Sequence, residues 1–221
     1  MWDVVKYSKE GVRNQEQGLL CQDYVYYHEK DSVQSITLAD GSGETDYARI
    51  GAEHTCKVLG MLLTKHFNEL CDIDKGLVQF NVITNIQTEL YNLCEKYRVK
   101  ISDLHSTLLG LAIDNDTDRF LAIHLGDGKI DVKSEGKIRT MSYPENGVNK
   151  SYTFLTSAHK VGSHIRVFRG KLKDITEFIL MSDGWNEKMK GENQFFFKDI
   201  ISLAEERRYI DDVSLIALIR Q

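Results

Sequence analysis

The chain has 221 residues, enough to bury one sizeable hydrophobic core, and we expect a single domain over residues 1–221. Hydrophobic residues make up 42% of the chain and charged residues 28%, with only one proline, which is typical of folded globular proteins and excludes a disordered chain. The formal net charge of −5 argues against a nucleic-acid-binding protein, because such proteins usually carry a basic face.

The sequence also bears on location. Residues 1–6 lack the basic and apolar segments of a signal peptide, and no apolar run approaches the ~20 residues needed to span a bilayer. The four cysteines show no CxxC or other metal-like spacing: Cys21, Cys56, Cys71 and Cys94. Free thiols in a reducing compartment are the simplest interpretation. We therefore expect a cytoplasmic protein with no membrane contact.

The predicted elements begin with short strands that are rich in β-branched and aromatic residues, at 2–7, 23–28 and 33–39. Apolar residues then recur at helical spacing, which predicts two amphipathic helices over 46–67 and 75–97. Strand patterns resume afterwards at 106–113, 119–125, 129–133, 137–142, 152–155, 164–169 and 177–182. A last helix is expected over about 193–208 and a closing strand over 213–220. This order predicts an α+β fold, a β-sandwich of two mainly antiparallel sheets flanked by helices.

Isolated aspartates stand where apolar runs end or begin. Three of them follow such a run and precede a glycine, and two open the closing run: Asp40, Asp127, Asp183, Asp211 and Asp212. A carboxylate at a strand end is rigidly held, and a neighbouring glycine lets the backbone approach an ion or phosphate. Any one of them could equally cap a turn or a helix. Several meeting at one sheet edge would make an oxygen-ligand site for a hard divalent cation, which indicates metal-assisted hydrolysis.

Six motifs, in order along nearly the whole chain, resemble those of the metal-dependent type 2C Ser/Thr protein phosphatases in their compact bacterial form. They are Gly11 followed by Cys21-Gln22-Asp23, then Leu38-Ala39-Asp40-Gly41-Ser42-Gly43, Ser106-Thr107-Leu108-Leu109-Gly110, Leu125-Gly126-Asp127-Gly128, Met181-Ser182-Asp183-Gly184-Trp185 and Asp211-Asp212-Val213-Ser214-Leu215. Each motif alone is weak, because Asp-Gly is a common turn, but six in this order are specific. The resemblance implies a β-sandwich flanked by pairs of helices, the fold that the element pattern predicts independently.

The resemblance also implies a ligand set for two Mn²⁺ or Mg²⁺ ions. Asp40 matches the carboxylate that bridges the two ions, with the carbonyl of Gly41 as a further ligand. Asp183 and Asp211 match the remaining carboxylates of the first ion, whereas Asp212 matches a group that orients ligands or water.

Further positions are implied more loosely. Asp127 and Glu187 fall where members of the family hold a weaker third ion. Asp23, together with the three aspartates of the first ion, completes the set expected to take part in catalysis. The implied reaction is hydrolysis of a phosphomonoester by a metal-activated water, without a phospho-enzyme. The implied role is dephosphorylation of phosphoserine or phosphothreonine proteins, opposing a Ser/Thr kinase in bacterial signal transduction.

The sequence departs from the family pattern at three places. Gln22 stands where an acidic metal ligand usually precedes Asp23, and Ser42 stands where some members carry a histidine that is a candidate general acid. The phosphate-binding arginine has only two candidates, Arg13 and Arg49. These departures leave two alternatives open: a catalytically degenerate regulatory or binding module, and a phosphatase of small phosphoesters.

The histidines show neither H-x-H nor H-E-x-x-H spacing, which makes a zinc site improbable. We expect His124, on a predicted strand, to be a partly buried residue with satisfied hydrogen bonds rather than a metal ligand.

Overall fold

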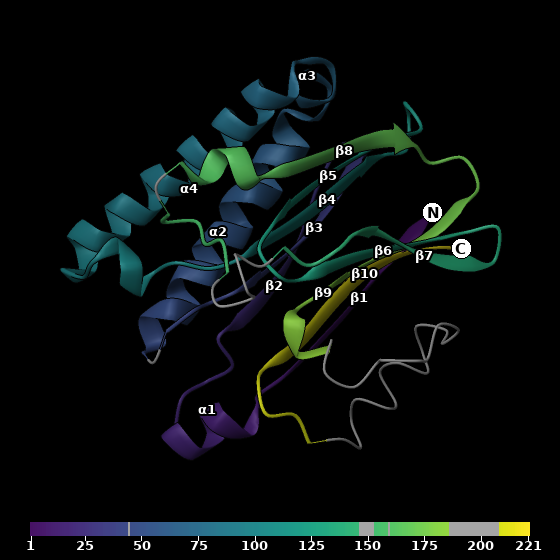
Figure 1. The fold of residues 1–221 in the computed structure, drawn as a ribbon. Helices are drawn as coiled ribbons and strands as arrows, with labels where there is room; N and C mark the ends of the chain where they lie inside the picture. The colour runs from purple at the N-terminus through teal and green to yellow at the C-terminus, as the bar shows by residue number, and fades with distance from the viewer. Residues whose placement is uncertain (44, 146–152, 159, 186–207) are drawn as a thin grey trace.

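The computed structural model describes the chain except for residues 44, 146–152, 159 and 186–207. Two five-stranded antiparallel sheets face each other as a sandwich (Figure 1). The first sheet consists, in spatial order, of β1 (Trp2–Lys9), β10 (Val213–Arg220), β9 (Ile175–Met181), β6 (Lys129–Ser134) and β7 (Lys137–Ser142). The second consists of β2 (Asp23–Lys30), β3 (Val33–Asp40), β4 (Leu108–Asp114), β5 (Arg119–Leu125) and β8 (Arg166–Lys171).

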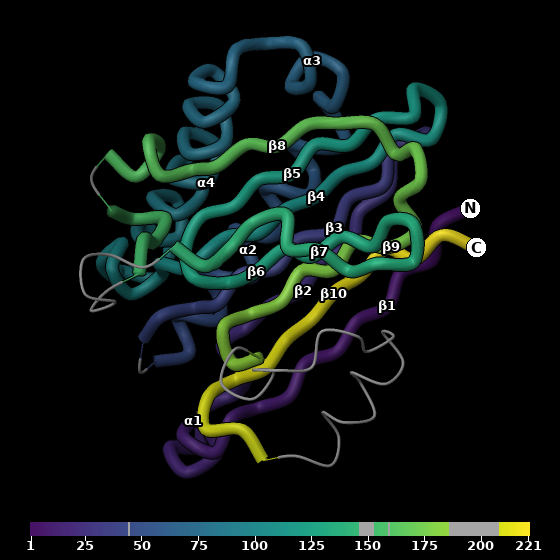
Figure 2. The backbone as a smooth tube through the Cα atoms, turned by 45° about the vertical axis from the view of Figure 1, so that its right-hand side comes forward, coloured from purple at the N-terminus to yellow at the C-terminus, as the bar shows by residue number. Residues whose placement is uncertain are grey.

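Helices cover the outer face of the second sheet (Figure 1). The described helices are α1 (Val12–Gln17), α2 (Asp46–Lys65), α3 (Phe67–Asp72) and α4 (Lys75–Tyr97), with short 3₁₀ turns η1 (Ile101–Asp103), η3 (Val161–His164) and η4 (Asp183–Trp185). Figure 2 shows the two termini side by side, because β1 and β10 pair along their whole length. None of the described helices is long and apolar enough to cross a membrane.

The second sheet is apolar on both faces, because it separates two hydrophobic layers. On β4, Leu108 and Ala112 pack against the helices, whereas Leu109 and Leu111 point into the space between the sheets. All four side chains are completely buried. A strand with successive side chains on opposite faces needs such a continuous apolar run when both faces are covered. This packing makes the strand ends rigid supports for the polar residues that follow them.

The predicted pair of antiparallel sheets with helices is confirmed, and β10 has the predicted bounds. The predicted helix 46–67 ends at Lys65, because the chain turns at His66 so that Phe67 and Leu70 of α3 reach the core. The predicted strand 106–113 starts two residues later, and η3 takes the first position of the predicted strand 164–169.

Two predicted elements are not found among the described residues. Residues 152–155 were expected to form a strand, but of those described only Thr153 forms a β-bridge. The expected last helix, 193–208, lies outside the described residues except for Arg208, which is not helical. Helix α1 was not predicted, because its six mostly polar residues show no apolar periodicity. The helix is terminated by Gly18, whose positive φ of 68° favours glycine.

His124 ties the end of β5 to β7. Its side chain is fully buried, with Nε2 3.0 Å from the carbonyl oxygen of Gly126 and Nδ1 2.7 Å from the hydroxyl of Ser142. A carbonyl only accepts, so Nε2 carries the hydrogen and Nδ1 accepts from the serine, which defines a neutral imidazole. Burial, helped by the charge of Arg166, lowers the pKa of His124 to about 3. The expected satisfied histidine is confirmed, and its burial is complete rather than partial.

His124 should make the stability of the protein fall in acid. Its folded pKa lies below its ordinary value of 6.5, so between these two values the unfolded chain binds a proton that the native state does not. Stability is therefore lost as the pH falls through this window. Replacing the histidine by a neutral amide, His124→Gln, should remove this contribution. In urea unfolding, the stability advantage of wild type over the variant should shrink between about pH 7.5 and about pH 5. A difference that does not vary with pH would contradict the assignment.

Candidate metal centre

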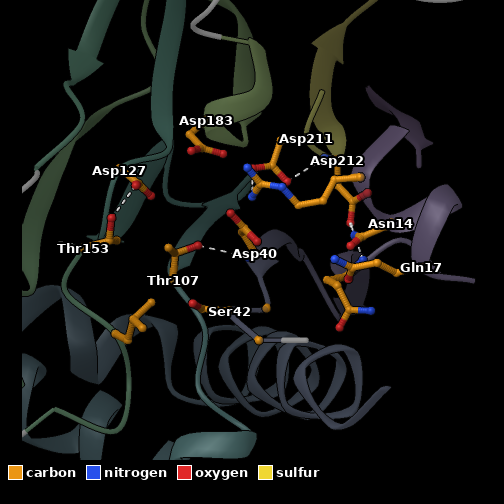
Figure 3. A pocket seen from close by; sticks show the side chains of 15 residues that line it. Asn14, Gln17, Asp40, Ser42, Thr107, Asp127, Thr153, Asp183, Asp211 and Asp212 are labelled. Carbon is orange, nitrogen blue, oxygen red and sulfur yellow. Dashed lines mark hydrogen bonds and ion pairs between the residues drawn. The ribbon is translucent and has the colours of Figure 1, made fainter. Parts of the chain in front are cut away.

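Aspartates from both sheets meet at one end of the sandwich. They line a cavity of about 540 Å³ together with residues of α1, and the acidic residues in its wall are Asp40, Asp127, Asp183, Asp211 and Asp212. Figure 3 shows the carboxylates of the first four directed towards a common space. The structure thus brings these aspartates together at the ends of apolar strands.

Hydrogen bonds fix the first two carboxylate-bearing positions. Asp40 ends β3, where its amide donates to the hydroxyl of Thr107 at 3.0 Å and its carbonyl accepts from the amide of Thr107 at 2.9 Å. The hydroxyl of Thr153 donates to the carboxylate of Asp127, which follows β5. Both threonines line the cavity. Sequence reasoning missed Thr153 because nothing in its surroundings marks it.

Asp183 and Asp211 come from neighbouring strands of the first sheet. Asp183 opens η4 two residues after the end of β9, and Asp211 lies two residues before β10. The two segments pack so closely that a Cβ on Gly184 would lie 2.2 Å from the carbonyl oxygen of Asp212. Only glycine fits after Asp183, which explains this part of the Asp-Gly motif physically.

Three carboxylates come close enough to share one ion. Asp40, Asp127 and Asp183 each place one oxygen so that all three atoms lie within 4.8 Å of one another. Asp211 faces the same cavity, but its Oδ2 lies 3.9 Å from Nη1 of Arg13. The structure therefore brings together Asp40, Asp127 and Asp183 most tightly, with Asp211 at the side. Glu187 lies outside the described residues.

The carboxylates repel one another strongly. Burial raises the pKa of Asp40 well above its ordinary value, and the charges of its acidic neighbours raise it further, in the order Asp23, Asp183, Asp211 and Asp127. A carboxyl group with this many anionic neighbours is stabilised by a cation. The ligand atoms are all oxygens, the type that Mg²⁺ and Mn²⁺ prefer, and no histidine lines the described part of the cavity. The residues present therefore fit the divalent ions that the sequence implies.

Asp23 lies behind the cavity rather than in its wall. It is directly opposite Asp40 in the β2–β3 pairing, is 2% exposed, and has no hydrogen-bond partner for either carboxylate oxygen among the described residues. The neighbouring hydroxyls of Ser182 and Ser214 donate elsewhere, to a backbone carbonyl and to another serine. Burial and the charge of Asp212 raise the pKa of Asp23 to about 7. The structure therefore places Asp23 beside Asp40 but outside the described cavity wall, and its expected part in catalysis stays a prediction.

The structure separates the two candidate phosphate-binding arginines. Arg13 is on α1 and lines the cavity. Arg49 donates to the backbone carbonyls of Cys21 and Asp23 and lies over the ring of Tyr24, 5.7 Å from its centre. Arg49 is therefore occupied in holding the start of β2, and only Arg13 is placed to meet a ligand in the cavity.

Gln22 lines the cavity, but its side chain is engaged in the fold. Its Oε1 accepts from the amide of Arg49, near the start of α2, at 3.1 Å, and its Nε2 donates to the carbonyl of Leu20 at 2.8 Å. The amide thus caps α2 and closes the loop before β2. A carboxylate could not make both bonds, so the neutral residue at this position has a structural reason.

Comparison with known proteins assigns the family. A family model described as protein phosphatase 2C matches residues 10–216. The chain belongs to the protein phosphatase 2C family. A search of the curated proteins with the sequence found no match.

Solved structures of similar fold extend the assignment of the phosphatase 2C fold over the whole chain. The S. agalactiae serine/threonine phosphatase is 17% identical with a TM-score of 0.72, and each chain is covered completely. The Mycobacterium tuberculosis serine/threonine phosphatase PstP/Ppp is 15% identical with a TM-score of 0.74, covering 100% of this chain and 99% of that one. RsbX, in complex with magnesium, is 15% identical with a TM-score of 0.64, covering 100% and 96%. At sequence identities this low, these structural similarities show a shared fold alone.

The capping role of Gln22 predicts a loss of stability on truncation. Gln22→Ala should lower the free energy of unfolding by about 1 kcal/mol, the usual cost of losing a helix-capping hydrogen bond. Gln22→Glu should cost at least as much, because the buried side chain would place a carboxylate oxygen against the carbonyl of Leu20, where the amide now donates. The control Gln17→Ala, an exposed residue of the same cavity wall, should change stability by no more than about 0.5 kcal/mol. Equal stability of Gln22→Ala and wild type in chemical unfolding would refute the capping role.

Proposed function

We propose that this protein is a Mn²⁺- or Mg²⁺-dependent protein serine/threonine phosphatase. The observation that carries the proposal is the convergence of Asp40, Asp127 and Asp183 within 4.8 Å, with Asp211 in the same cavity. Membership of the protein phosphatase 2C family supports it. We further infer that the substrates are phosphoserine or phosphothreonine proteins, modified by a Ser/Thr kinase in cytoplasmic bacterial signalling.

Each residue has a role in this proposal. Asp40 would serve both ions, with the carbonyl of Gly41 as a further ligand. Asp183 and Asp211 would complete the ligands of the first ion, and Asp127 would hold a third ion. When bound, the cations neutralise phosphate charge and lower the pKa of water for attack on phosphorus.

The chain's own groups orient the ligands and the substrate. Thr107 and Thr153 fix Asp40 and Asp127, and Asp23 lies behind Asp40, where its ionised form favours a cation in front of Asp40. Arg13 supplies a guanidinium at the cavity that can bind two phosphate oxygens at once.

A second candidate function is a regulatory module that binds without turning over substrate. The specific observation that favours it is Ser42, which lines the cavity where some family members carry a histidine. One structural neighbour belongs to a study of the bacterial stressosome, at 17% identity and a TM-score of 0.62. A phosphatase of small phosphoesters is the third reading, and the substrate range separates it from the first.

Hydrolysis assays test the proposal directly. The protein should release phosphate from p-nitrophenyl phosphate and from a phosphothreonine peptide with Mn²⁺ or Mg²⁺, and not with EDTA. Asp40→Asn should abolish turnover, while its melting temperature without metal stays equal or rises by a few degrees, about 2–4 °C, because a repelling charge is removed. Release from the aryl ester alone would favour small phosphoesters. If the protein hydrolyses neither substrate but still binds Mn²⁺, the regulatory module is favoured. Normal turnover by Asp40→Asn would refute the metal assignment.

Arg13 should contribute to substrate binding. Arg13→Ala should raise KM for the phosphothreonine peptide about tenfold, as expected for the loss of a charge-assisted hydrogen bond, with a smaller rise for Arg13→Lys. Arg139→Ala, an exposed arginine on β7 outside the described cavity wall, serves as the control and should leave KM unchanged. Equal effects of Arg13→Ala and Arg139→Ala would mean that only overall charge matters.

A further inference from the structure

Asp212 lies beside a candidate metal ligand, yet its carboxylate is engaged elsewhere. The side chain is 3% exposed and accepts three hydrogen bonds. Its Oδ1 accepts from the amide of Gly11 at 2.7 Å, and its Oδ2 accepts from Nδ2 of Asn14 at 2.7 Å and from the amide of Gln22 at 2.5 Å. Figure 3 shows the carboxylate of Asp212 directed towards Asn14. Both oxygens are thus committed to donors of the protein itself.

All three donors belong to one segment, residues 11–22. This segment contains α1 and supplies one wall of the cavity, with Arg13, Asn14, Gln17 and Gln22 in its lining. A helix of six residues is too short to be stable by itself, so its position depends on what holds it.

The segment is attached to the residues that lead into β10. The amides of Val12 and Arg13 donate to the carbonyls of Tyr209 and Ile210, at 2.9 and 3.1 Å. Gly11 packs so tightly there that a Cβ would lie 2.3 Å from the carbonyl carbon of Asp211. Asp212 adds three charge-assisted bonds to these contacts, and among the described residues only Asp212 bonds both ends of the segment.

We propose that Asp212 is the positioning residue that fixes residues 11–22 and thereby holds Arg13 over the cavity for the phosphate of a phosphorylated side chain. The substrate part of this inference rests on the proposed function. An anion is needed here because three N–H donors converge on two oxygens. An asparagine of the same shape offers one oxygen and turns an NH₂ group towards another donor. Replacing the carboxylate should therefore loosen the whole wall.

The first readout is hydrogen exchange, which does not require activity. Asp212→Asn should speed amide exchange in peptides covering residues 11–22 about tenfold, because local opening becomes easier, and leave the central strands protected. Asp114→Asn is the matched control: Asp114 is 2% exposed, accepts from Ser32, Asp116 and Thr117, and is not part of the described cavity wall. It should leave exchange of residues 11–22 unchanged.

The second readout is the coupling between Asp212 and Arg13. Asp212→Asn should raise KM for the phosphothreonine peptide about as much as Arg13→Ala, roughly tenfold, while kcat and Mn²⁺ affinity measured by calorimetry stay within about twofold. The double variant should be no worse than either single one, because both act through one guanidinium. Asp114→Asn should not change KM.

If Asp212→Asn does not fold, a milder variant tests the same contact. Asn14→Ala removes one of the three hydrogen bonds to Asp212 and should speed exchange in the same peptides. The proposal would be overturned if amide exchange of residues 11–22 were unchanged in both variants. It would also be overturned if the KM increases of Asp212→Asn and Arg13→Ala multiplied in the double variant. If wild type hydrolyses no phosphoester, the proposed function fails, whereas the exchange data still decide whether Asp212 holds the wall.

Discussion

The central constraint on the site is the mutual repulsion of carboxylates that the fold holds close together. Asp40 is surrounded by four other acidic groups, and burial adds to their effect on its pKa. Such a cluster opposes folding unless a cation balances it. The fold can sustain it because Asp40 comes from a strand of one sheet, while Asp183 and Asp211 border strands of the other. The apolar layer between the sheets therefore holds the two halves of the site at a fixed separation.

The sequence predicted the parts of this arrangement that leave a local signal. Apolar runs that end in Asp-Gly marked the positions of Asp40, Asp127 and Asp183, because a buried strand must be apolar and its end must turn. Helices α2 and α4 were visible through their apolar period. What could not be predicted lies where position depends on distant contacts. Helix α1 has no apolar period of its own, and its bonds to residues 209, 210 and 212 place Arg13 at the cavity.

The same limit explains why two arginines looked equivalent in the sequence. Arg13 and Arg49 both lie near motifs of the set, and the sequence around neither of them reveals its partners. The structure separates them because Arg49 finds carbonyl acceptors at the start of β2, whereas Arg13 lies on a surface helix beside the acidic cavity. Hydrogen bonds between segments, not residue type, decide which of the two arginines faces the cavity.

The two departures from the family pattern, at Gln22 and Ser42, differ in what they say about activity. Gln22 makes two hydrogen bonds that no carboxylate could make together, so its neutrality follows from the fold and is not evidence of lost activity. Ser42 has no comparable structural reason. Against degeneracy stands the energetic cost of the cluster itself. A protein that only needed the fold would be more stable with Asn in place of Asp40, because the repulsion from its acidic neighbours would disappear while the shape remained. Retaining this acid among the others is costly unless a cation occupies the site, and this supports the proposed metal dependence.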